Sequence, residues 1–319
     1  MILPLRTLVL VVLLAASAGA ESRLRWDIVP GVGYSFGTAR YRMEGTTVIS
    51  QLDFPLDQPV GGVRIELAML RDGRPDWSVT AEVATALGDP HGTFDDRDWD
   101  ILGDGSLALF STTKSHVEGS QTRLRGEVCK RALRGPNWDI ALFAGFAYHS
   151  ISQTAVDVTG SQVVLDSVGN GHWVEFSYVI RALTYDLDVY QSMVGVAPRL
   201  YPEPRLTIEG RFAVSPILYV KDLDDHLLRG FTSRAEGYGF GWSARLMMRF
   251  EPKWNREGGR LFGLLVGDYY HQKVDKSTVV EYYRDVAGEP YPKGTVLPGV
   301  PHEIVGHQSA IGVQVGVTF

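Results

Sequence analysis

An acidic stretch at residues 94–100 (Phe-Asp-Asp-Arg-Asp-Trp-Asp) holds residue types that could take part in catalysis. If the stretch is extended, Asp96 and Asp98 lie on one face, because side chains two positions apart on a strand point the same way. Two neighbouring carboxylates repel each other when both are ionised, so one pKa rises and that carboxyl tends to stay protonated as a hydrogen-bond donor. Such a pair could stabilise negative charge that develops on a substrate.

A second acidic stretch, at residues 221–226 (Lys-Asp-Leu-Asp-Asp-His), supplies a candidate base. Asp224 and His226 share a face if this stretch is also extended. A carboxylate beside an imidazole orients the ring, so that it can take a proton from water near neutral pH. Acidic runs are more often solvated loops than sites, and each stretch taken alone is best interpreted as a loop. The features of the rest of the chain favour a catalytic site over two solvated loops.

The sequence predicts no metal site. Asp96, Asp98 and Asp100 lack the sixth-position Gly and twelfth-position Glu of a helix-loop-helix calcium site. Cys129 is the only cysteine, which excludes an internal disulfide and a cysteine-based metal cluster. The histidines other than His226 show no metal-ligand spacing, and the motifs of serine hydrolases, zinc proteases and phosphate-binding loops do not occur.

Residues 1–20 are expected to be a signal peptide, because Arg6 precedes an apolar run that ends in Ala-Gly-Ala. Beyond them, no run approaches the roughly 18 apolar residues of a membrane helix, which excludes a helical membrane protein. The whole chain has 31 basic and 37 acidic side chains. Without Arg6 the mature chain carries a net charge of −7 (30 − 37), so no nucleic-acid partner is expected.

Apolar residues recur with a period of two over lengths that could cross a membrane. Between residues 237 and 250 every even position is apolar or aromatic, whereas the odd positions carry Gly, Ser, Met or Arg. Residues 311–319 alternate in the same way and end in Phe319. Only helices and closed barrels satisfy the backbone inside lipid, so the pattern predicts an all-β fold, an antiparallel transmembrane β-barrel of the outer membrane.

The alternation predicts ten strands, at residues 26–43, 47–71, 76–90, 114–133, 138–153, 173–200, 205–221, 233–251, 260–281 and 304–319. Tight turns are expected at 71–75, 134–137, 202–204 and 258–259, and longer connections near 44–47, 91–113, 154–172, 222–232 and 282–303. In barrels of this kind short turns are periplasmic and long loops are extracellular. Both acidic stretches would then lie in outer loops, where they can face one another across the barrel mouth.

With these features in place, the chain resembles the omptin family of outer-membrane proteases over essentially the whole mature length. Residues Ile49–Phe54 (Ile-Ser-Gln-Leu-Asp-Phe) are similar to an early-strand segment of that family. Asp95–Trp99 resembles its first catalytic pair with the Trp that follows, and Asp224–His226 resembles its Asp-x-His pair. A strand similar to the family's, containing Phe212–Pro216, precedes that second pair.

The resemblance implies one barrel domain over residues 21–319, with catalytic extracellular loops. It places the carboxylate pair on Asp96 and Asp98 and the dyad on Asp224 and His226. The family selects a basic residue before the cut bond with two acids deep in the groove. Asp222 matches one of these acids and is the expected substrate-binding residue.

The sequence departs from the family at the second of these acids. The corresponding first-strand position falls near Gly37 or Thr38, neither of which is acidic. A single carboxylate would have to balance a buried basic side chain, so we expect a weaker preference for Arg or Lys than two acids would give.

We therefore hypothesise an outer-membrane endopeptidase that cleaves extracellular polypeptides at the barrel mouth with water activated by His226. We expect a monomer without a cofactor. Lipopolysaccharide is the candidate membrane partner and the lipid that could be required for activity. The alternative is a catalytically silent barrel that acts as an adhesin or small porin, and ten strands leave little room for an aqueous channel. A barrel enzyme that acts on lipid ranks last, because both acidic stretches lie at the aqueous rim.

Overall fold

The computed structural model describes residues 23–45, 47–165, 170–252, 260–286 and 291–319. The expected signal peptide (residues 1–20) and the turn expected at residues 258–259 lie outside the described residues. The described residues form twelve strands: β1 (Arg23–Glu44), β2 (Val48–Pro55), β3 (Gln58–Arg71), β4 (Arg74–Ala86), β5 (Thr93–Ile101), β6 (Leu107–Arg134), β7 (Trp138–Leu165), β8 (Gly171–Glu203), β9 (Leu206–His226), β10 (Phe231–Phe250), β11 (Arg260–Tyr282) and β12 (Val296–Thr318).

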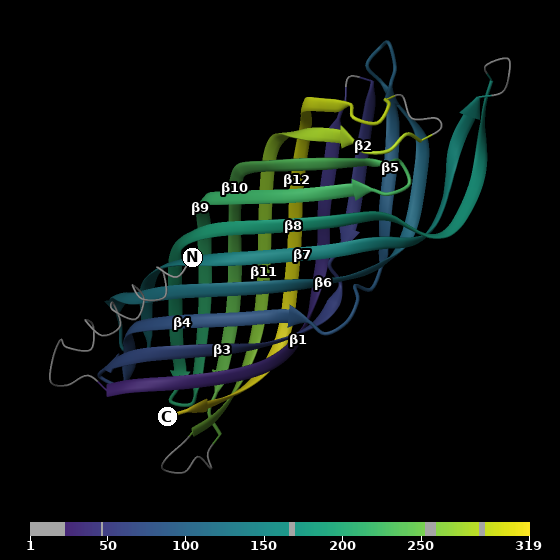
Figure 1. The fold of residues 1–319 in the computed structure, drawn as a ribbon. Coiled ribbons are helices and arrows are strands. Elements are labelled where there is room, and N and C mark those ends of the chain that lie inside the picture. The colour runs from purple at the N-terminus through teal and green to yellow at the C-terminus, as the bar shows by residue number, and fades with distance from the viewer. Residues whose placement is uncertain (1–22, 46, 166–169, 253–259, 287–290) are drawn as a thin grey trace.

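Ten of these strands form a closed antiparallel ring in the order β1-β3-β4-β6-β7-β8-β9-β10-β11-β12 (Figure 1). The last strand pairs with the first from Asp27↔Thr318 to Met43↔His302, so the ring has no free edge. The predicted all-β barrel is confirmed. No helix in the described part of the chain has the length and apolar character needed to cross a membrane.

β2 and β5 form a second tier of wall above β3 and β4. The first half of β1 pairs with β3 and its second half with β2, while β6 pairs with β4 and then with β5. β2 and β5 pair with each other and close the gap. The prediction of a single strand at 47–71 is therefore wrong, because this segment forms two strands, β2 and β3. The prediction of a loop at 91–113 is also wrong, because this segment contains β5 and the start of β6.

The change of partner along β1 takes place at Gly37. Its φ of +144° lies in a region that side-chain-bearing residues rarely adopt, and an added Cβ would lie 2.0 Å from the carbonyl oxygen of His307 on β12. The Asp57 carboxylate, between β2 and β3, accepts the Gly37 N–H at 2.8 Å. Gly therefore meets two requirements here, an unusual backbone angle and a close approach of two strands.

Three other expected loops also contain strand. β7 and β8 extend through most of 154–172 and project beyond the other strands (Figure 1). β9 and β10 leave only residues 227–230 as a turn, and β12 begins at Val296 rather than at 304. Above the membrane both faces of a strand meet water or protein, so the apolar outer face that reveals a strand in the sequence is missing. The tight turns expected at 71–75, 134–137 and 202–204 are confirmed.

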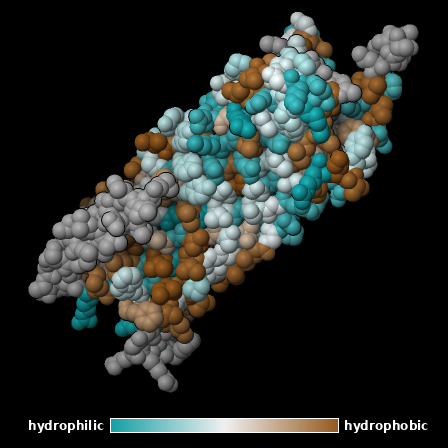
Figure 2. Space-filling model, in the orientation of Figure 1, coloured by the Kyte–Doolittle hydropathy of each residue, from teal (hydrophilic) through white to brown (hydrophobic). Residues whose placement is uncertain are grey.

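Outward-facing apolar side chains on strands all around the ring form an apolar belt. Figure 2 shows apolar patches on the face turned toward the viewer. Leu246, one of the apolar even positions of residues 237–250, is 49% exposed. On one side the belt ends at the end of the barrel where the short turns and Phe319 lie, which we call the turn end. On the other side it ends at a row of outward tyrosines in ring contact: Tyr148, Tyr190, Tyr219 and Tyr238. Such aromatic girdles mark the membrane interface. The wall beyond this row, including β2 and β5, is the loop end.

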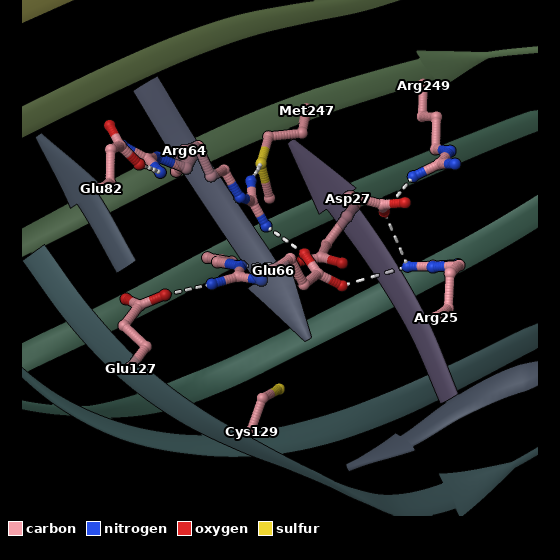
Figure 3. A network of polar contacts seen from close by, with 12 residues as sticks. Arg25, Asp27, Arg64, Glu66, Glu82, Glu127, Cys129, Met247 and Arg249 are labelled. Atoms are coloured by element: carbon pink, nitrogen blue, oxygen red, sulfur yellow. Dashed lines mark hydrogen bonds and ion pairs between the residues drawn. The ribbon is translucent and has the colours of Figure 1, made fainter. Parts of the chain in front are cut away.

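Paired charges occupy the lumen toward the turn end, where several of them line a cavity of about 550 Å³ (Figure 3). Arg64 and Arg25 both bind Glu66, and Arg25 and Arg249 both bind Asp27. A second set joins β6, β8 and β9 through Arg125, Glu127, Arg211, Glu209 and Arg199. Each of these charges has at least one counter-charge, on its own strand or on another strand of the ring, which offsets the cost of burying it.

Replacement of Gly37 by Ala tests the position at which β1 changes its pairing partner from β3 to β2. The added methyl group would be strained by the backbone angle and would collide with β12, so we expect a loss of about 1–3 kcal/mol. Gly263→Ala on β11 is the matched control, since its Cβ meets no described atom within 4 Å. The temperature at which the folded band converts to the unfolded band on a gel should fall only for Gly37→Ala. Equal temperatures for both variants would contradict this account.

Candidate active site

The first carboxylate pair lies on β5, in the second tier of the wall. β5 is held between β2 and β6, with Leu52 opposite Asp96 and Ser50 opposite Asp98. The two carboxylates project to the inner side together with Phe94, which packs on the ring of Phe54 at a centroid distance of 4.8 Å. This buried aromatic contact anchors the strand beneath the two acids.

The second pair lies at the end of β9. His226 Nε2 is 2.7 Å from Asp224 Oδ2, and both side chains are buried. The ring of Phe231 on β10 stacks on the imidazole at 4.3 Å. A tight turn follows, in which the His226 carbonyl accepts the N–H groups of Arg229 and Gly230. The imidazole is therefore fixed by a carboxylate, an aromatic ring and the turn.

The two pairs meet in one cavity at the loop end. Asp96, Asp98 and His226 line a space of about 710 Å³ that also borders Arg229. Asp224 lies behind the imidazole and is fully buried. Strands from opposite parts of the ring thus bring an acid pair and an Asp-His pair to the same space, the arrangement expected from the sequence.

The environment favours a protonated carboxyl at Asp96. Burial raises its pKa well above the ordinary value, and the neighbouring Asp98 carboxylate raises it further. Its Oδ2 accepts a long hydrogen bond from the Thr113 hydroxyl at 3.5 Å, while Oδ1 is buried without a partner among the described residues. Burial also raises the pKa of Asp98, but a hydrogen bond from Ser50 and the charge of Arg229 oppose this shift.

Asp222 lies deeper and is ion-paired. Lys276 on β11 places its Nζ 2.6 Å from Asp222 Oδ1, and His302 Nε2 on β12 is 3.8 Å from Oδ2. Burial raises the pKa of Asp222 to about 6, although Lys276 opposes the shift. Burial and Lys276 lower the pKa of His302 to about 3, so this imidazole is neutral.

Sequence reasoning did not identify Arg229, Lys276 or His302. Arg229 had a local signal, because it follows His226 by three residues in the hairpin. The other two had none: they lie on β11 and β12, and their contact with Asp222 exists only because the ring brings these strands beside β9. Within the described residues no three His, Cys, Asp or Glu side chains are grouped so that they could hold a metal ion.

Comparisons with known proteins identify the family of this chain. The model of the omptin family matches residues 31–253, which include both acidic pairs. The chain belongs to the omptin family. This membership, together with the barrel, supports an outer-membrane protease of bacterial origin.

One solved structure shows the same fold. The outer membrane protease OmpT from Escherichia coli superposes with a TM-score of 0.74 at 16% identity, over 92% of this chain and 97% of that one. The outer membrane protein OprG from Pseudomonas aeruginosa gives a TM-score of only 0.33 at 9% identity, over 92% and 95% of the two chains, which is too low to carry an argument. No curated protein matches the sequence.

Replacement of Asp96 by Asn should stabilise the barrel at neutral pH. A carboxyl whose pKa is raised by folding contributes stability at low pH that is lost as pH rises through the raised pKa. Asn stays neutral, so the variant should unfold at a higher temperature than wild type near pH 7.5, and the difference should vanish near pH 4. The outward-facing Asp95→Asn is the control and should show no such trend. A lower unfolding temperature for Asp96→Asn at pH 7.5 would contradict the assignment.

Proposed function

We propose that this omptin is an endopeptidase whose nucleophile is a water molecule held between the acid pair and His226. The observation that carries the proposal is the shared cavity, in which Asp96 and Asp98 from β5 face His226 from β9. A peptide bond that enters this space would have a base on one side and a hydrogen-bond donor on the other. These are the two groups that hydrolysis by water requires.

His226 is the proposed general base. Its Nε2–H donates to Asp224, which fixes the ring and the tautomer, so that Nδ1 can accept a proton from water. Asp224 then stabilises the imidazolium that forms. After the water attacks the carbonyl carbon, the proton held by His226 passes to the leaving nitrogen.

Asp96 is the proposed oxyanion donor. In its protonated form the carboxyl donates a hydrogen bond to the carbonyl oxygen as negative charge develops there. Its unpartnered buried oxygen and its raised pKa support this role. Asp98, whose carboxylate is favoured by Ser50 and Arg229, orients the water. The proposed mechanism uses no metal.

The proposal also concerns orientation and partners. The loop end would face the cell exterior and the turn end the periplasm, as in other barrels with short periplasmic turns. The substrates would then be extracellular polypeptides, and lipopolysaccharide would contact the apolar belt and the girdle. A monomer suffices, because one chain supplies all four catalytic groups. The porin alternative is disfavoured by the paired charges that occupy the lumen.

Removal of either dyad member should abolish most peptidase activity. His226→Ala removes the base and Asp224→Asn removes its orienting carboxylate, so kcat should fall by about 10²–10⁴-fold in each. Asp98→Ala should also be severe, and double variants across the cavity should lose far less than the product of the single losses. The measurement is cleavage of a peptide library by protein reconstituted with lipopolysaccharide.

Asp225→Asn is the matched control. Asp225 lies between the two dyad residues but points outward, where it accepts a hydrogen bond from Tyr283 at 2.9 Å. The peptidase activity of Asp225→Asn should stay within about twofold of wild type, because the substitution changes none of the charged side chains that line the cavity. Heat-modifiable migration should be retained in every variant. Peptide cleavage that persists in His226→Ala, or its absence in lipid-bound wild type, would leave the silent barrel as the explanation.

The protonated role of Asp96 predicts a specific pH profile. The rate of wild type should fall on the alkaline side as Asp96 loses its proton. An Asn side chain donates a hydrogen bond at every pH, so Asp96→Asn should keep more activity than Asp96→Ala and should lack the alkaline fall. An Asn variant as inactive as the Ala variant at all pH values would argue against a donor at this position.

A further inference from the structure

The carboxylate expected to recognise a basic substrate side chain is already occupied. Lys276 Nζ contacts Asp222 at 2.6 Å, and the exposed fractions of the two side chains are 3% and 0%. The Lys276 stem crosses over Gly237 of β10, where an added Cβ would lie 3.0 Å from Lys276 Cβ. The absence of a side chain at Gly237 therefore lets a lysine of β11 reach an acid of β9.

The space around Asp222 is also closed. His302 is fully buried beside the carboxylate, and the Tyr41 ring packs on it at 3.9 Å. Tyr185 packs on Tyr41 from the other side at 5.9 Å. The cavity that Asp96, Asp98 and His226 line is bordered by neither Asp222 nor Lys276. A substrate side chain in this cavity would have to displace an ion pair and buried aromatic rings to reach Asp222.

The cavity itself presents mostly apolar surface next to the reacting groups. One wall is the packed cluster of Phe231, Val280 and Tyr282 with Leu297 and Val300. The other wall comes from the β5, β6, β7 and β8 segments of the loop end and includes the following side chains: Phe94, Phe110, Val158, Phe176, Tyr178 and Leu183. An apolar lining of this extent favours apolar ligands, because a bound apolar side chain would remove it from water.

The charged side chains of the cavity also favour an apolar substrate side chain. Its acids are the proposed catalytic carboxylates Asp96 and Asp98, and Arg229 lies close enough to lower the pKa of both. A substrate Arg or Lys beside the cut bond would meet Arg229, and it would compete for the carboxylates that the reaction needs. An apolar side chain incurs neither cost.

We infer that this site accepts apolar and aromatic side chains beside the cut bond in preference to Arg or Lys, and that Lys276 is the residue that excludes basic substrates. The inference rests on the proposed endopeptidase function. Lys276 acts through Asp222 and is a specificity-determining residue, not a catalytic one.

The test is the ratio of kcat/KM values for matched peptides that carry Leu, Phe, Arg or Lys before the cut bond. Wild type reconstituted with lipopolysaccharide should cleave the Leu and Phe peptides at least about tenfold better. Lys276→Ala removes the ammonium group that pairs with Asp222 and opens space above the carboxyl. The basic group of a substrate Arg can then take the place of that ammonium group, so the Arg-to-Leu ratio should rise about tenfold. Adding Asp222→Ala should cancel this rise.

Lys273→Ala is the matched control. Lys273 lies on the same strand but is exposed and binds Glu303, so its loss should leave the ratio unchanged. Lys276→Met, which removes the charge but keeps most of the volume, serves if Lys276→Ala does not fold. A wild type that prefers Arg or Lys overturns the inference, as does a ratio unaffected by a folded Lys276 variant.

A protein without endopeptidase activity would give a different result in this experiment from a protease with another specificity. If wild type cleaves none of the peptides, the endopeptidase assignment falls, and recognition is measured instead by the binding of the same peptides carrying a fluorescent label. Tighter binding of the Leu and Phe peptides would support apolar recognition by a non-catalytic groove. Equal or tighter binding of the Arg and Lys peptides would overturn it.

Discussion

Closure of the ring by the pairing of β1 with β12 is the constraint on which the rest of the structure depends. Lipid offers no hydrogen-bond partners, so every backbone group of the wall must be paired with a neighbouring strand. The closed ring fixes the distance between β5 and β9, which carry the two halves of the site. Because the wall is held by its full length of backbone hydrogen bonds, the side chains at its rim are free to serve chemistry.

The closed ring also decides what its interior must contain. Side chains alternate between lipid and lumen, so the neighbours of the outward apolar residues are buried inside the barrel, and many of these inward residues are polar or charged. Between the girdle and the turn end the solution is a lattice of alternating charges, such as Glu127–Arg211–Glu209. The pair of Asp222 and Lys276 applies the same solution one layer below the site. Asp222, the acid expected to recognise a basic substrate side chain, is therefore one of the paired charges inside the barrel.

The sequence predicted the membrane-crossing part well and the rim poorly. Residues such as 237–250 show their strand because lipid imposes an apolar outer face, and Asp-Gly at 72–73 marks its turn through two positive φ values. The segment 93–101 has water or protein on both faces, so its polar residues suggested a loop. Neither the second tier of wall nor the contact of Lys276 with Asp222 could be foreseen, because each depends on which strands the closed ring makes neighbours.

The insertion of β3 and β4 between β2 and β5 has a consequence for the order of folding. β2 and β5 can meet only after the intervening hairpin has formed, since the hairpin brings their ends together and lowers the entropy cost of closing that long loop. β9 comes opposite β5 only when the last strands complete the cylinder. A chain that is still in transit to its membrane therefore carries the two halves of the candidate site apart, and the proposed catalytic arrangement first exists in the fully assembled barrel.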